Sequence, residues 1–310
     1  MLPDDVLFEI FDFYGIDCEV CCYPWRWHTL VHVCRRWRQI IFASPLRLEL
    51  QFVCTPRTRV RELLEFLPPS IPITIRNYFD TPPAPGSESA PSIKDGSQVI
   101  AALEQRDDVY SIDLEDLPSS VLEKLATTMQ GTYPTLVYIL LSAADEAAPI
   151  LRKEFLGGSA PYLDRIWLRG IPFPDAPQLF SSTRDLVHLR LQRIPDSGYF
   201  PPDAMITALS TCTKLESILI DFIGNPYPDL TGQEIAPLST HISLPALNCF
   251  AFEGHGKYFH YFFSRIENPL FMLEGNFDMN KRVHYEVSLT PFGVSFHYWD
   301  VRLMDPVPAE

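Results

Sequence analysis

The chain has 310 residues, with 25 lysines and arginines against 39 aspartates and glutamates, and a formal net charge of -14. Hydrophobic residues make up 46% of it, which is enough to bury roughly three quarters of the surface of the unfolded chain. This length favours one elongated unit or two domains. The acidic balance repels phosphate backbones and anionic lipids, so it argues against a nucleic-acid or membrane-surface partner.

The N-terminal sequence and the distribution of apolar residues predict a location. The first residues lack the basic and apolar regions of a secretion signal, and no apolar run approaches the ~18 residues that span a bilayer. We therefore expect a soluble, intracellular protein, cytoplasmic or nuclear. The 29 prolines, about 9% of the chain against a usual ~5%, indicate many short elements.

The seven cysteines form no regular framework, which is typical of free thiols in a reducing compartment. One cluster could in principle supply four zinc ligands: Cys18, Cys21, Cys22, His28, His32 and Cys34. Its last three members fall within a helical pattern, and no second CxxC or paired histidine spacing accompanies them. Structural thiols are the favoured interpretation, and we expect no metal and no other cofactor.

Residues 1–66 differ from the rest of the chain in charge and pattern. They carry 8 of the basic and 9 of the acidic residues, whereas residues 67–310 have a net charge of -13. Apolar residues at helical spacing predict one helix to about Phe13, and the spacing resumes at Leu30 and stops at Ser44-Pro45, which gives two or three short helices in all. A helical module this small buries little by itself, so it should complete its core against a partner or a neighbouring domain.

Residues 67–98 should contain a first strand and a loop rich in proline and serine. The loop is either a tolerated surface insertion, which we favour, or a regulatory phosphorylation site.

From residue 99 onward the motif L-x-x-L-x-L recurs, where L is any large apolar residue. Six full motifs begin at Val109, Leu136, Leu163, Leu186, Leu215 and Leu247, and a partial one begins at Leu270. They start 23 to 32 residues apart, in or just beyond the 20 to 29 residues of leucine-rich repeats. Each motif predicts a short strand with one apolar side, and the stretches between them should return as helices or turns.

Three helical returns are visible, over residues 121–129, 150–156 and 205–209. Alternating apolar residues from Val283 to Tyr298 predict a C-terminal strand pair. The predicted class is therefore α/β. Its parts are a helical module, an irregular solenoid with a parallel inner sheet over residues 99–280, and a β cap over residues 281–310.

The chain contains none of the usual catalytic motifs. G-x-G-x-x-G, a Walker A loop, G-x-S-x-G and H-E-x-x-H are all missing, so we expect no enzyme. His255 and His260 could be offered as a ligand pair. Because aromatic residues fill the stretch from Tyr258 to Phe263, a packed aromatic helix or loop is the better interpretation.

Two N-terminal motifs carry a family resemblance. Leu2-Pro3-Asp4-Asp5-Val6, followed later by Val33-Cys34-Arg35-Arg36-Trp37, resembles an F-box, whose pattern is LPxE/D at the start and VCxxW near the end. With the irregular repeats, the chain resembles F-box/leucine-rich-repeat proteins of the fungal F-box-like type, over residues 2–60 and more diffusely over 99–280. It departs from the pattern in a longer loop before Trp27 and in Leu46-Arg47-Leu48, which replaces an aromatic residue after the late proline.

The resemblance implies a substrate-receptor subunit of an SCF-type cullin-RING ubiquitin ligase. The F-box would bind the Skp1 adaptor, and through it a cullin, while the solenoid holds a target protein and accelerates ubiquitin transfer by positioning alone. One alternative is a leucine-rich-repeat interaction scaffold with no ubiquitin-ligase role. Another is an unrecognised hydrolase.

By the same resemblance, one set of apolar residues should contact Skp1: Leu2, Pro3, Val6, Ile10, Val33, Cys34 and Trp37. Arg35, Arg36 and Arg38 should lie at the edge of that contact, suited to an acidic adaptor. The competing interpretation is that these residues form the module's own core.

The residues that alternate with the apolar ones should face the concave side of the solenoid. They are Ser111, Asp113 and Glu115; Tyr138 and Leu140; Arg165, Trp167 and Arg169; His188, Arg190 and Gln192; Ser217, Leu219 and Asp221; and Cys249, Ala251 and Glu253. Five of them, Arg165, Trp167, Arg169, His188 and Arg190, gather cations beside a tryptophan within an acidic domain. They suggest an anchor for an acidic or phosphorylated peptide. A solvated polar face is the alternative.

Overall fold

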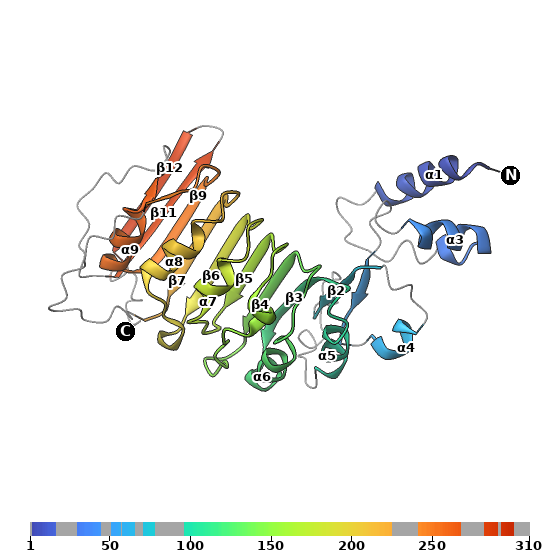
Figure 1. Cartoon of the computed structure of the whole chain (residues 1–310), viewed down its shortest axis with the longest axis horizontal. Coiled ribbons are helices and arrows are strands. Elements are labelled where there is room, and N and C mark those ends of the chain that lie inside the picture. Colours follow the sequence, from blue (N-terminus) through green and yellow to red (C-terminus); the bar gives the residue numbers. More distant parts are fainter. Residues whose placement is uncertain are drawn as a thin grey trace, which may run out of the picture. The chain divides into compact units, whose positions relative to one another are not determined.

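The computed structural model describes residues 2–16, 30–44, 51–56, 58–65, 71–77, 96–224, 241–267, 282–290 and 293–300. The chain forms two compact units, residues 1–115 and 116–310. The fold is α/β with a mostly parallel sheet, and the predicted class is confirmed. Figure 1 shows the strands and helices of each unit.

The first unit begins with two helices, α1 (Asp4–Ile16) and α3 (Arg35–Ala43). The stretch with helical spacing from Leu30 to Ser44 is not one continuous helix, because a turn at His32 and Val33 interrupts it. Cys34 caps the new helix: its backbone is extended and its Sγ accepts a hydrogen bond from the Trp37 amide at 3.5 Å. A side chain that accepts from the first turn satisfies an amide that has no helical partner.

Three parallel strands follow, with a short helix before each of the last two. They are β1 (Phe52–Cys54), α4 (Val60–Leu64), β2 (Ile73–Arg76), α5 (Ser97–Leu103) and β3 (Val109–Leu117). The expected strand within residues 67–98 is confirmed. The purely helical description of residues 1–66 is wrong at β1, whose three residues are all buried and therefore show no alternation. The loop predicted to be rich in proline and serine lies largely outside the described residues.

The second unit has a parallel run of five strands followed by an antiparallel pair. In spatial order they are β4 (Tyr138–Ala143), β5 (Arg165–Arg169), β6 (His188–Ile194), β7 (Ser217–Phe222), β9 (Cys249–His255), β11 (Arg282–Thr290) and β12 (Gly293–Asp300). A separate parallel pair joins β8 (Ile242–Ser243) and β10 (Ile266–Glu267). The predicted C-terminal strand pair is confirmed as β11 and β12.

Each of the six full motifs overlaps a strand, and the residues at its three L positions are 3% exposed or less. The alternation therefore predicted both the strands and the side that they bury. The partial motif at Leu270 lies outside the described residues.

Helices lie along one face of the sheet that β4, β5, β6, β7, β9, β11 and β12 form in the second unit (Figure 1). We call it the second sheet. They are α6 (Ser119–Thr128), α7 (Ala176–Phe180), α8 (Pro202–Leu209) and α9 (Gly256–Phe263), with short 3-10 turns at Phe155–Gly158 and Asp196–Gly198. The predicted helices at 121–129 and 205–209 are confirmed.

The predicted helix at residues 150–156 is wrong. Leu156 and the next two glycines have positive φ, which ends a right-handed helix, and the segment bonds outward instead. The Leu151 amide donates to the Pro172 carbonyl at 2.8 Å and the Leu156 amide to the Met129 carbonyl at 2.7 Å. Gly157 and Gly158 accommodate these angles, and two adjacent glycines in the sequence already indicated that a helix would end there.

Helix α9 is the packed aromatic helix that the sequence favoured over a histidine ligand pair. Tyr258, Phe259 and Phe262 are buried. The ring of Phe259 lies 4.7 Å from that of Tyr285 on β11. His255 caps the helix by accepting a hydrogen bond from the Lys257 amide. None of the helices in the described part of the chain is long and apolar enough to cross a membrane.

Candidate functional site

Four of the apolar residues predicted to contact an adaptor are exposed in the N-terminal helices. Leu2 is 51% exposed, Val6 37%, Ile10 39% and Val33 58%. Pro3 and Cys34 are exposed as well. Because exposed apolar side chains gain free energy when a partner covers them, their gathering on one small module marks a candidate interaction surface.

The helices have a separate core beneath these residues. Leu7 and Phe11 of α1 and Ile40 and Ile41 of α3 are buried. Trp37 is half-buried, and its ring makes an edge contact with Phe11 at 5.0 Å. The structure therefore separates Trp37, which belongs partly to the module's own packing, from the exposed residues predicted beside it.

The three arginines predicted at the edge of this surface differ in their contacts. Arg36 donates to the Leu2 carbonyl at 2.6 Å and pairs with the Asp4 carboxylate at 2.5 Å, which ties the start of α1 to α3. Arg38 donates to the Val31 carbonyl at 3.0 Å. Arg35 is exposed. Two of the three thus serve the module's own structure.

The second candidate site is the face of the second sheet opposite its helices, which we call the open face. The strand register aligns its residues in three rows across β4, β5, β6, β7, β9 and β11, and row three is interrupted between Gln192 and Asp221, where the register shifts. Row one holds Tyr138, Arg165, His188, Ser217, Cys249 and Ser288. Row two holds Leu140, Trp167, Arg190, Leu219, Ala251 and Glu286. Row three holds Ser142, Arg169, Gln192, Asp221, Glu253 and His284.

All five residues predicted to bind a target meet on β5 and β6 of this face. Arg165 lies beside His188, and Trp167 lies beside Arg190. The Arg190 guanidinium stands 5.0 Å from the centre of the Trp167 ring, a cation–π contact. The Trp167 indole N–H donates to Gln192 at 2.8 Å, which fixes the ring, and Arg165 pairs with the adjacent Asp164 at 3.0 Å.

Sequence reasoning missed Arg193, which joins this group. Strict alternation assigns Arg193 to the buried side, but the β6–β7 register shifts after Leu191 and Arg193 has a φ of 52°. The irregularity leaves Arg193 exposed and buries Ile194 instead. The Asp221 carboxylate accepts the Arg193 amide at 3.1 Å. The signal was the break of alternation at Gln192-Arg193-Ile194.

Arg169 and Arg193 both line a pocket of about 510 Å³ at the carboxyl ends of the strands. Asp116, Asp145, Glu146 and Asp196 line it too. Ser119 donates to Asp145 through its hydroxyl and its amide, and these bonds lower the pKa of that carboxyl. Ligand sites in parallel sheets favour this end of the strands.

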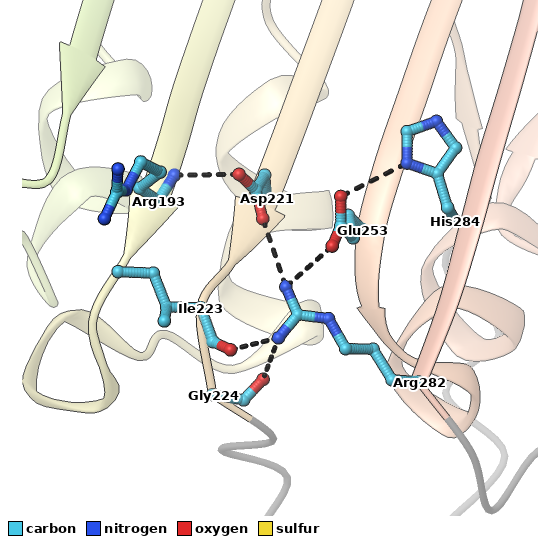
Figure 2. A network of polar contacts seen from close by, with 7 residues as sticks. All are labelled: Arg193, Asp221, Ile223, Gly224, Glu253, Arg282 and His284. Atoms are coloured by element: carbon cyan, nitrogen blue, oxygen red, sulfur yellow. Dashed lines mark hydrogen bonds and ion pairs between the residues drawn. The ribbon is translucent and has the colours of Figure 1, made fainter. Parts of the chain in front are cut away.

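The acidic residues of row three are neutralised within the sheet (Figure 2). The Arg282 guanidinium lies 2.8 Å from Glu253 and 3.5 Å from Asp221, and it also donates to the carbonyls of Ile223 and Gly224. His284 lies 3.2 Å from Glu253. The network joins β7, β9 and β11 at their aligned ends.

The two carboxyls of this network shift in opposite directions. The hydrogen bond with His284, and then the charge of Arg282, lower the pKa of Glu253. Desolvation raises the pKa of Asp221 despite the bond from Arg193. The network therefore favours the charged form of Glu253, whereas burial disfavours the charged form of Asp221.

The three β3 residues predicted to face the concave side, Ser111, Asp113 and Glu115, do not form an open surface. Ser111 and Asp113 lie beside Thr74 and Arg76 of β2 and are 8% and 6% exposed. Glu115 is exposed and its amide donates to Asn77.

No group of three or more histidine, cysteine, aspartate or glutamate side chains is placed to hold a metal ion within the described ranges. Of the six residues weighed as possible zinc ligands and interpreted as structural thiols and helix residues, Cys18, Cys21, Cys22 and His28 lie outside those ranges. Cys34, Cys54, Cys212 and Cys249 are free thiols. Burial raises the pKa of Cys54 to about 12.

Comparison of the chain with models of known protein families, with curated proteins and with solved structures gives no match.

Proposed function

We propose that this chain is a substrate-receptor subunit of an SCF-type ubiquitin ligase, an F-box/leucine-rich-repeat protein without catalytic residues of its own. Its N-terminal helices bind a Skp1-type adaptor, and the open face of its repeats holds a target protein. Two proteins held by one chain react at a high effective concentration, so positioning is the whole contribution of the receptor.

One observation carries the adaptor half of the proposal. Leu2, Val6, Ile10 and Val33, which the F-box resemblance assigns to adaptor contact, are exposed, while Leu7 and Phe11 between them are buried. If these motif residues formed the module's own core, the same four would be covered. The competing interpretation from the sequence is therefore disfavoured.

Charge supports the same partner. Arg35 is exposed beside Val33 and Cys34, and residues 1–66 are nearly neutral in a chain of net charge -14. An acidic adaptor meets less repulsion at this module than at the rest of the chain.

The test is a pull-down and titration with purified Skp1. Val6→Asp and Ile10→Asp place a charge in the proposed contact without disturbing a buried residue, and each should weaken binding at least tenfold. Leu63→Asp is the matched control, since Leu63 is 40% exposed on α4 and outside both F-box motifs. It should bind as the parent does.

A parent chain that does not bind Skp1 would leave the interaction scaffold as the better function. Equal binding by the three variants and the parent would place the adaptor contact elsewhere.

A further inference from the structure

The open face concentrates cations on β5 and β6. The group comprises Arg165, Trp167, Arg169, His188, Arg190 and Arg193, which we call the basic cluster. Residues 67–310, to which it belongs, have a net charge of -13. Four arginines gathered on two adjacent strands against that balance create a local positive field on an acidic protein.

Arg169 and Arg193 share their pocket with four carboxylates, those of Asp116, Asp145, Glu146 and Asp196, and no ion pair within the described residues joins them. In the part of the chain that the structure describes, no carboxylate lies within ion-pair distance of Arg169, Arg190 or Arg193; Arg165 does pair with Asp164. The nearest acidic residues of row three, Asp221 and Glu253, are engaged by Arg282. The network in Figure 2 thus supplies a cation from β11 to the two acidic residues of row three.

The cluster has two cationic ends, and Trp167 with the Arg190 guanidinium stacked on it lies between them. One end is Arg165 beside His188, and the other is Arg169 with Arg193 at the strand ends. Arg165 and Arg169 are four positions apart on β5, a distance of roughly 13 Å at ~3.3 Å per residue. Between the ends lies row two, where the Trp167 ring is held by its bond to Gln192 and lies between Leu140 and Arg190.

We propose that the basic cluster binds an extended, acidic segment of a partner protein that carries two anionic groups four residues apart. One anion lies at Arg165 and His188, the other at Arg169 and Arg193, and an apolar side chain between them covers Trp167. Arginine pairs bidentately with either a carboxylate or a phosphoryl group. The inference rests on the proposed function only where it identifies this partner as the ligase target. Binding of the acidic segment to the basic cluster requires no adaptor.

Peptide is favoured over nucleic acid by the same charges. A nucleic acid longer than the cluster would have to lie against a face and a chain of strongly negative charge, whereas a short peptide carries anions only where the cations are. The Trp167 ring in the central row also matches an apolar side chain better than a phosphodiester backbone.

Fluorescence anisotropy with the full chain tests this inference. The probes are a labelled ten-residue peptide with glutamates at positions 3 and 7 and leucine at 5, and its counterpart with phosphoserines at 3 and 7. Both should bind, the phosphopeptide more tightly because of its larger charge. A peptide with its glutamates at positions 3 and 4 should bind at least tenfold more weakly, and a glutamine peptide should not bind.

Arg190→Glu and Arg193→Gln should each weaken binding of both probes at least tenfold. Arg184→Glu is the matched control, since Arg184 is an exposed arginine outside the cluster, and it should bind as the parent does. Trp167→Leu, which keeps an apolar side chain, should lose the cation stack and weaken binding several-fold. Urea unfolding of each variant shows that the fold is retained.

The inference is overturned if neither probe binds, if Arg190→Glu and Arg184→Glu behave alike, or if a ten-nucleotide RNA binds more tightly than the acidic peptides. Skp1 is not present in this assay. If the chain binds the peptides but not Skp1, the ligase role is contradicted, and the inference that the basic cluster binds acidic peptides still holds.

Discussion

Removal of the Arg282 side chain should destabilise the end of the second sheet. In Arg282→Met the carboxylates of Asp221 and Glu253, which face each other in register, lose the cation that they share. Breaking a fully buried pair costs about 3–5 kcal/mol, and an exposed pair contributes about 0.2–1 kcal/mol. The three side chains are 23–26% exposed, so we expect a loss of about 2 kcal/mol.

A double-mutant cycle isolates the electrostatic part of this effect. Asp221→Asn should be mild in the parent, because desolvation already disfavours that charge. In the Arg282→Met background the same change removes the repulsion between the two carboxylates, so it should recover about 1 kcal/mol. Arg282→Lys should lose less than Arg282→Met.

The assay is urea unfolding at pH 7 followed by circular dichroism and by tryptophan fluorescence, with coincident transitions as the condition for quoting free energies. Arg184→Met is the control for loss of an exposed arginine. The reasoning is refuted if Arg282→Met matches that control, or if the effects of Arg282→Met and Asp221→Asn simply add.

Three further predictions concern the same unit. Because the pKa of Glu253 is lowered from 4.5, its contribution to stability is complete above that value and is lost as the pH falls below it. Glu253→Gln should therefore flatten the acid side of the stability curve, and an unchanged acid limb would contradict the network. Arg193→Gly should gain about 0.5–1 kcal/mol in urea unfolding, because glycine accepts a φ of 52°, while it weakens acidic-peptide binding; a less stable variant would argue against strain there. Phe259→Ala should cost about 3–5 kcal/mol, since the ring is fully buried against β9 and β11, and a loss below 1 kcal/mol would mean that α9 does not support the sheet.

The strands of the repeats could be predicted because burial on one side imposes a period of two. Leu189 and Leu191 are buried and Arg190 between them is exposed, so the sequence determines the face of each residue. The positions of Trp167 and Arg190 followed from the same rule. Strand β1 could not be predicted, because Phe52 to Cys54 is short and buried throughout.

The remaining errors arise where the backbone departs from regular geometry. The irregularity at Arg193 reverses the face of that residue, and the positive φ of Leu156 ends a segment with helical spacing. The spacing of apolar residues does not predict either change, because each depends on a hydrogen bond to another segment. The Arg193 amide donates to Asp221, and the Leu156 amide donates to the Met129 carbonyl. Trp37 is likewise half-buried, unlike the exposed Val33 and Cys34 before it, because its ring contacts Phe11 on the other helix.

Alkylation of Cys34 tests the adaptor surface most directly. Cys34 is exposed beside Val33 at the N-terminus of α3, and Cys249 on the open face provides a reference within the same chain. We expect saturating Skp1 to slow iodoacetamide labelling of Cys34 at least tenfold, as measured by mass spectrometry, and to leave Cys249 unchanged. An unchanged rate at Cys34, or protection of Cys249 in its place, would contradict adaptor binding through the N-terminal helices.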